Sequence, residues 1–166
     1  MKILLVTIAV LAVIALAGCG FKNGSNSHDA PTGRLVRFEF SEHGTMAQPN
    51  KFYRLKLDTA NHVWLMVHTD KLEVDSTVLT EVERMIVEQG IYKYEKHYEP
   101  NMEVMDGEGW AFGATYDNGE RLSSSGDNAW PQNFSILNIC HYLDSVMAAG
   151  GDRIVRGDSI TYDYDF

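Results

Sequence analysis

Residues 53–67 read YRLKLDTANHVWLMV and contain two short runs in which apolar and polar side chains alternate. Alternation with a period of two is typical of a β-strand that is buried on one face. The intervening Asp58-Thr59-Ala60-Asn61 is rich in turn-forming residues, and so brief a connection favours antiparallel neighbours. The segment therefore predicts two paired strands, with Trp64, Met66 and His68 on the face opposite the apolar one.

The same alternation extends outward along the chain in both directions. Upstream, Val36, Phe38 and Phe40 predict a further strand, which completes a three-stranded meander. Downstream, residues 70–75 are interpreted as a polar link and residues 91–98 as a short strand. Asp117-Asn118-Gly119 is a hairpin-turn signal. The strands expected around and after it are residues 110–116, 121–125 and, at the end of the sequence, 160–166.

Two segments follow the helical period of 3.6 residues instead. Their apolar stripes are Val78, Leu79, Val82, Met85 and Ile86 in the first, and Ile136, Ile139, Cys140, Leu143, Val146 and Met147 in the second. Asp75 or Ser76 is expected to cap the first helix, and Gly90 and Gly150-Gly151 to end the two helices. The prediction is an α+β fold: an antiparallel sheet of about five to seven strands with two helices packed on one face.

The N-terminus carries a different kind of signal. Lys2 precedes an apolar run, residues 3–17, that is too short for a permanent membrane span but suits a secretory signal. The run ends in Leu16-Ala17-Gly18-Cys19, which resembles the lipobox of bacterial lipoproteins. That resemblance implies cleavage before Cys19, lipid attachment to Cys19 and, because Gly20 follows, delivery to the outer membrane.

Composition divides the rest of the chain into a tether and one domain. Residues 19–33 are the lipidated cysteine and a segment of mostly Gly, Asn, Ser, Asp and Pro, expected to be flexible. Residues 34–166 suit a single domain with one core. The formal net charge of −9 disfavours nucleic acid and anionic headgroups as partners, so the membrane contact is expected to come from the lipid.

The C-terminal half carries a second resemblance. Its pieces are Met105-Asp106-Gly107-Glu108-Gly109-Trp110, then Ser124-Ser125-Gly126-Asp127-Asn128-Ala129-Trp130-Pro131, then Asn133-Phe134. These are similar to a group of uncharacterised bacterial proteins, many of them lipoproteins, with an Asp-Gly before an aromatic strand and a Gly-x-Asn-Ala-aromatic-Pro turn. The resemblance covers about 30 residues and implies no activity.

This half also supplies the candidate ligand or partner surface, which consists of Asp106, Trp110, Asn128 and Trp130. Two indoles, a carboxylate and an amide are groups that can line a pocket for a sugar or a peptide. The alternative is structural: Asp106-Gly107 makes a turn, Trp110 packs in the sheet and Asn128 ties down the loop before the helix. The structural interpretation is the stronger, because function has to be argued from a site.

The remaining reactive residues predict no catalytic or metal site and no cofactor. Cys140 lies in the apolar stripe of its helix and His141 points about 100° away from it, so a nucleophile pair is disfavoured. The six histidines lack zinc spacing, and Asp117, Asn118 and Gly119 are better explained by a hairpin than by a calcium loop.

Together these observations predict a membrane-anchored cell-envelope lipoprotein whose domain is a non-enzymatic binding or assembly module. Its expected partner is a protein, peptide or glycan. The alternative is an envelope hydrolase whose residues converge only in three dimensions.

Overall fold

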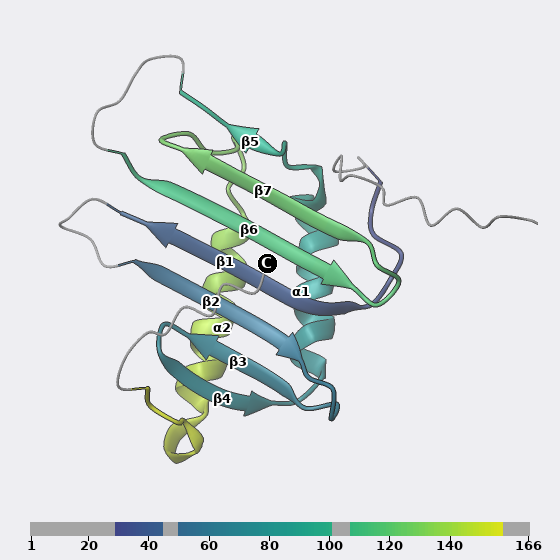
Figure 1. Ribbon diagram of the computed structural model, residues 1–166, viewed down its shortest axis with the longest axis vertical. Coiled ribbons are helices and arrows are strands. Elements are labelled where there is room, and N and C mark those ends of the chain that lie inside the picture. The colour runs from purple at the N-terminus through teal and green to yellow at the C-terminus, as the bar shows by residue number, and fades with distance from the viewer. Residues whose placement is uncertain (1–28, 45–49, 101–106, 158–166) are drawn as a thin grey trace, which may run out of the picture.

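The alternating segments assemble into one seven-stranded sheet with the order β4-β3-β2-β1-β6-β7-β5. The computed structural model describes residues 29–44, 50–100 and 107–157, and it shows an α+β fold, as predicted (Figure 1). All neighbouring strands are antiparallel except β5 and β7, which are parallel. The elements are β1 (Leu35–His43), β2 (Lys51–Leu57), β3 (Val63–Val67), β4 (Asp70–Val74), α1 (Thr77–Glu88), β5 (His97–Tyr98), β6 (Gly109–Tyr116), β7 (Arg121–Asp127) and α2 (Ile136–Ala149).

The predicted meander of β1, β2 and β3 is confirmed. Phe38 lies opposite Leu55, and Leu55 lies opposite Leu65, so that three fully buried side chains follow one another across the sheet. Trp64 and Met66 are on the other face, as the alternation requires.

Two details of the strands differ from the prediction. Leu35, not Val36, joins Phe38 and Phe40 in the core, because the pairing of β1 with β6 shifts register between Leu35 and Arg37. Such a bulge moves the residues before it to the opposite face. The segment interpreted as a polar link is β4, an edge strand. Because Leu72 is its one fully buried side chain, the segment shows no alternation of apolar and polar residues.

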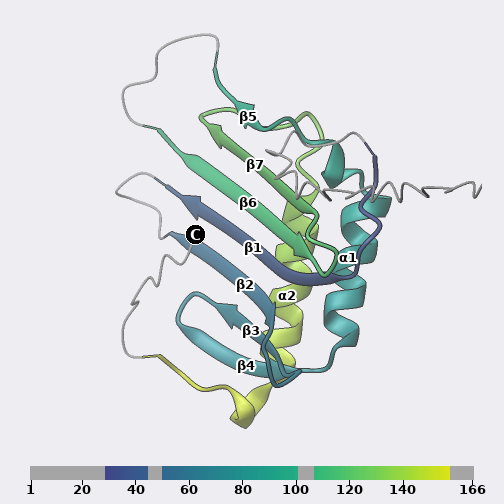
Figure 2. The same cartoon turned by 45° about the vertical axis from the view of Figure 1, so that its right-hand side comes forward.

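The two predicted helices are confirmed, and Figures 1 and 2 show both of them on the same face of the sheet. Each turns its apolar stripe toward the strands, and Ile86, Ile139 and Leu143 are fully buried. At the start of α1 the Asp75 carboxylate accepts a hydrogen bond from the Thr77 amide N–H at 2.8 Å. Gly90 follows the helix with a φ of 70°, the left-handed conformation that suits glycine at a helix end.

Residues 91–98 were expected to form a strand, and most of them do not. A 3-10 helix occupies Ile91–Lys93, and only His97–Tyr98 pairs with β7. The buried side chains here are Ile91 and Tyr94, three residues apart, which suits a helical turn and not a strand.

The result is a sheet with two unlike faces. The face toward the helices holds the core, including the predicted inward residues Trp110, Phe112, Ala114 and Tyr116. No helix covers the opposite face in the described part of the chain (Figure 2). The predicted signal sequence, Cys19 and the expected last strand, residues 160–166, lie outside the described residues.

Candidate functional site

Trp110, the centre of the predicted ligand surface, belongs to the core. Only 1% of its surface is exposed, and its indole N–H donates a hydrogen bond to the backbone carbonyl of Ala129 at 2.8 Å. Its ring packs against those of Phe134, Tyr98 and Tyr94, with centroid distances of 4.9, 5.8 and 6.3 Å. An indole enclosed in this way has no surface to offer a ligand.

The other members of the set divide between structure and surface. Asn128 has a φ of 51°. Its side-chain oxygen accepts a hydrogen bond from the backbone N–H of Glu108 at 2.9 Å, and its backbone N–H donates one to the backbone carbonyl of Glu108. It therefore ties the end of β7 to the start of β6. Trp130 is 39% exposed, and Asp106 lies outside the described residues. The structural interpretation accounts for Trp110 and Asn128 and leaves Trp130 at the surface.

Cys140 is 3% exposed, and burial raises the pKa of its thiol well above the usual value. A thiol that stays protonated is a poor nucleophile. His141, by contrast, is exposed.

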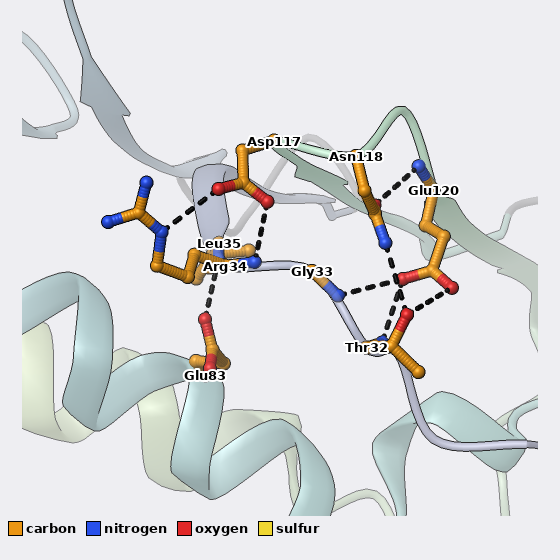
Figure 3. Close-up of polar contacts among 8 residues, drawn as sticks. All are labelled: Thr32, Gly33, Arg34, Leu35, Glu83, Asp117, Asn118 and Glu120. Carbon is orange, nitrogen blue, oxygen red and sulfur yellow. Dashed lines mark hydrogen bonds and ion pairs between the residues drawn. The ribbon is translucent and has the colours of Figure 1, made fainter.

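Sequence reasoning missed a polar cluster at the entry to the domain, which we call the N-terminal clasp (Figure 3). It consists of residues 32–35 and the side chains of Glu83, Asp117, Asn118 and Glu120 that bind them. The Glu120 carboxylate accepts hydrogen bonds from the amide of Thr32 at 2.8 Å, the hydroxyl of Thr32 at 3.1 Å and the amide of Gly33 at 3.0 Å. The end of the predicted tether is thus fixed to the β6–β7 hairpin.

Two more carboxylates continue the clasp into β1. Asp117 accepts hydrogen bonds from the Arg34 amide and from Arg34 Nε, both at 2.9 Å. Glu83, on α1, accepts one from the amide of Leu35 at 2.5 Å. A Cβ atom on Gly33 would lie 2.4 Å from the side-chain oxygen of Asn118, so a larger residue here would require the Asn118 side chain to shift. The hairpin residues predicted to make a turn therefore also hold the incoming chain.

These hydrogen bonds favour the charged form of each hairpin carboxylate. The Asn118 side chain, followed by the amides of Thr32 and Gly33, lowers the pKa of Glu120 from 4.5 to about 2. The Arg34 amide and then its guanidinium lower the pKa of Asp117. Both groups are ionised near neutral pH, and their oxygens are engaged with the chain itself. In the part of the chain that the structure describes, no group of three or more potential ligands could hold a metal ion.

The second feature that the sequence did not reveal is a group of cations on the open face of the sheet. We call it the basic patch and define it as Arg37 on β1, Arg54 and Lys56 on β2, Trp64 on β3, and Lys71 on β4. In the sheet, Arg37 lies opposite Lys56, and Lys56 lies opposite Trp64. These cations are far apart in sequence but adjacent in space, within a chain whose formal net charge is −9.

Trp64 is held in place at this patch. Its indole N–H donates to the Asp58 carboxylate at 3.0 Å, the Lys71 ammonium lies 4.0 Å from its ring centroid, and the His62 ring stacks beside it. His62 in turn pairs with Glu73, whose hydrogen bond and charge raise the pKa of His62. A fixed aromatic ring among cations loses little conformational entropy when a partner binds.

The two arginines share one carboxylate. Arg37 and Arg54 both contact a single oxygen of Glu39, at 2.8 and 2.5 Å, so the local charge stays positive. Arg54 also lies over the Phe52 ring, 5.2 Å from its centroid. The Nε of Arg37 is buried and has no hydrogen-bond acceptor among the described residues. An unpaired buried donor of this kind is costly.

The other half of the open face, over β6 and β7, has small side chains at its centre. Its central outward residues on β6 and β7 are small, namely Ala111, Gly113, Ser123 and Ser125, whereas Thr115, Arg121 and Asp127 lie toward the ends of these strands. A Cβ atom placed on Gly113 would meet nothing within 4 Å, so the space above it is open. The open face therefore combines a basic, aromatic half over β1 to β4 with a half over β6 and β7 whose central side chains are small.

A search of the described helices for one long and apolar enough to cross a membrane finds none. No protein-family model matches the chain, and no match was found among curated proteins or solved structures. The geometry of the two features above is therefore the basis for the proposal that follows.

Proposed function

We propose that this chain is a lipid-anchored lipoprotein of the cell envelope, attached to the outer membrane through Cys19, and that its α+β domain is a non-enzymatic binding module. The partner that the open face fits best is a polypeptide with acidic and apolar side chains. The observation that carries the proposal is the basic patch, where a fixed indole lies among four cations.

The sequence and the clasp support the anchoring half of the proposal. Leu16-Ala17-Gly18-Cys19 follows an apolar run, and residues 20–31 are mostly polar or small. If these residues behave as a coil, they reach about 20 Å. Because the clasp fixes the chain at Thr32, such a tether would hold the hairpin end of the domain toward the membrane. The open face would then point sideways, where a partner can approach it.

The chemistry of the patch supports the binding half. Arginine recognises carboxylates with well-defined geometry, and long cationic side chains keep apolar stems beside the aromatic rings. A partner with carboxylates and aromatic groups would meet both kinds of contact. Since the patch extends across four strands, an extended segment would contact more of it than a compact ligand.

The anchor is tested by Cys19→Ala. We expect the variant to leave the membrane fraction, because the membrane contact is assigned to lipid on this cysteine. Fractionation after a high-salt wash measures this, with Cys140→Ala as the control that keeps Cys19. Retention of Cys19→Ala on the membrane would contradict the anchoring proposal.

The binding surface is tested with immobilised poly-L-glutamate as an acidic polypeptide. The purified protein should be retained at low salt, and the double variant Arg54→Glu/Lys56→Glu should elute without retention. The control is Lys93→Glu/Lys96→Glu, which changes the net charge equally but lies away from the patch. Equal loss of retention in both variants would mean that net charge matters and the patch does not.

A further inference from the structure

The last described residues run along the outer edge of the sheet, beside the basic patch. Val155 exchanges two backbone hydrogen bonds of 2.8 Å with Lys71 of β4, in antiparallel orientation. Two residues later, Gly157 is so close to the β3–β4 turn that a Cβ atom on it would lie 2.5 Å from the carbonyl oxygen of Thr69. The chain is therefore at the end of β4 when it reaches residue 157.

β4 offers no further backbone positions for pairing beyond Gly157. Because the chain runs antiparallel to β4 and β4 begins at Asp70, the partner positions are used up at Gly157. At this edge of the sheet, α1 and α2 lie on one face (Figure 1), and the side chains of the basic patch belong to the other.

The sequence of this segment is complementary to the patch. It reads DSITYDYDF, in which Asp158, Asp163 and Asp165 are acidic and every second residue from Ile160 to Phe166 is apolar. Nine extended residues reach about 30 Å. With strands about 4.8 Å apart, the distance from β4 to β1 is about 15 Å, well within that reach.

We propose that residues 158–166 bind the basic patch of their own chain as an extended acidic segment. The proposal rests on the proposed function, because it names the ligand class of the same surface and supplies its first ligand. The carboxylates would pair with Lys71, Lys56 and the two arginines. The aromatic residues would pack on Trp64 and its neighbours.

Attachment makes this contact effective even if it is intrinsically weak. A short covalent connection holds the segment at an effective concentration on the order of millimolar. An outside partner must then displace the segment, so the segment would act as a built-in competitor. Glu39, Asp58 and Glu73 also lie at the patch and oppose the carboxylates of residues 158–166, which we call the tail. This opposition favours a contact that is exchanged over one that is permanent.

Zero-length carbodiimide crosslinking of the purified full-length protein tests the contact, because it joins a carboxylate to a lysine ammonium only when they touch. We expect mass spectrometry to find residues 158–166 joined to Lys56 and Lys71. Lys56 is the diagnostic site, since it lies two strands inside the edge and Lys71 is near the point of departure. Lys93 and Lys96 are internal controls.

Crosslinks to Lys56 should disappear in Asp158→Asn/Asp163→Asn/Asp165→Asn, whereas Asp152→Asn should leave them unchanged. Absence of tail crosslinks to Lys56 in the wild type, or yields no higher than at Lys93 and Lys96, overturns the proposal. A mixture of ¹⁴N- and ¹⁵N-labelled protein distinguishes crosslinks within one chain from crosslinks between two copies. Mixed-isotope products alone would assign the contact to a second copy and also overturn it.

The poly-L-glutamate column separates failure of this inference from failure of the proposed function. If the tail competes, the triple Asn variant should be retained to several-fold higher salt than wild type, beyond the shift given by Asp152→Asn scaled to the same charge. Retention with no tail crosslinks would refute the tail contact and keep the binding surface. If neither protein is retained, the binding surface itself is wrong.

Discussion

The two faces of the sheet are made by the same strands but hold different kinds of side chain. On β6, the face toward the helices carries Trp110, Phe112, Ala114 and Tyr116, all buried, while the open face carries Ala111, Gly113 and Thr115. On β2 and β3, the open side carries Arg54, Lys56 and Trp64. The covered face is where the free energy of folding is gained, and the open face is where substitutions are expected to change binding and not stability.

This comparison leads to a graded set of expectations. Changes on the covered face remove buried apolar surface, which is worth about 25 cal/mol per Å², or leave cavities and clashes. Changes on the open face and at its margins remove contacts that water partly replaces. Each prediction below therefore pairs two similar residues that differ in face or in hydrogen bonding.

The largest effect is expected at Trp110. Trp110→Ala should lower the free energy of unfolding by about 3–5 kcal/mol, because it empties a fully buried site and leaves the Ala129 carbonyl without its donor. Urea or thermal unfolding measures the change. For a domain of this size, such a loss is a large part of the total stability.

Trp130→Ala is the matched control, since the same side chain is truncated at a position that is 39% exposed. It should cost no more than about 1 kcal/mol. A large loss from both variants would make Trp130 structural as well, and a small loss from Trp110→Ala would mean that β6 does not face the core as described.

A pair of glycines gives the next largest contrast. Gly126, opposite Trp110 on β7, has no room for a methyl group: its Cβ would lie 2.2 Å from the Ala129 carbonyl oxygen and 2.3 Å from Trp110 Nε1. Gly126→Ala should therefore cost about 1–3 kcal/mol. Gly113→Ala, on the open face of β6, should be neutral or stabilising by about 0.5 kcal/mol, since a strand interior disfavours glycine. Equal changes in unfolding midpoint would contradict the difference between the faces.

The sequence was sufficient to predict most of the covered face, because its buried apolar side chains recur with the period of a strand or of a helix. Alternation identified β1, β2, β3 and β6, the hairpin-turn signal identified β7, and the 3.6-residue stripes identified both helices. It failed where an element buries too few side chains to show a period. The edge strand β4 fully buries Leu72 alone, and the bulge near Val36 is set by pairing with β6 and not by local sequence.

The two candidate features could not be predicted in the same way. The clasp joins amides at residues 32 and 33 to a carboxylate at residue 120, and backbone donors leave no trace in a sequence pattern. The basic patch had a partial signal, because Arg37, Arg54 and Lys56 occupy outward positions of predicted strands. Placing them together also required the strand order and β4, which carries Lys71 and was interpreted as a link.

A smaller effect on stability is expected from removing two tyrosine hydroxyls of the covered face that differ in their hydrogen bonding. The Tyr116 hydroxyl is buried and has no hydrogen-bond partner among the described residues, whereas the Tyr94 hydroxyl donates to the Asn133 carbonyl at 2.7 Å. Tyr116→Phe should leave stability unchanged or raise it by up to about 1 kcal/mol, and Tyr94→Phe should lower it by about 1 kcal/mol. Chemical denaturation of both variants measures the signs, and a clear loss from Tyr116→Phe would reveal an unrecognised partner of its hydroxyl.

The smallest effect on global stability is expected at the clasp, where the readout is local. The pKa of Glu120 is about 2 in the folded protein and 4.5 ordinarily, so its contribution is present above pH 4.5 and is lost as the pH falls toward 2. The amide protection factors of Thr32 and Gly33 in hydrogen exchange should therefore fall across that range.

Glu120→Gln should show low protection of both amides even at pH 7, with little further change in acid. The amides of Ala60 and His62, which donate to Asp58, are the internal control and should match wild type at every pH. If Thr32 and Gly33 remained protected in Glu120→Gln, the clasp would not depend on this carboxylate, and the entry of the chain would be held by Asp117 and Glu83.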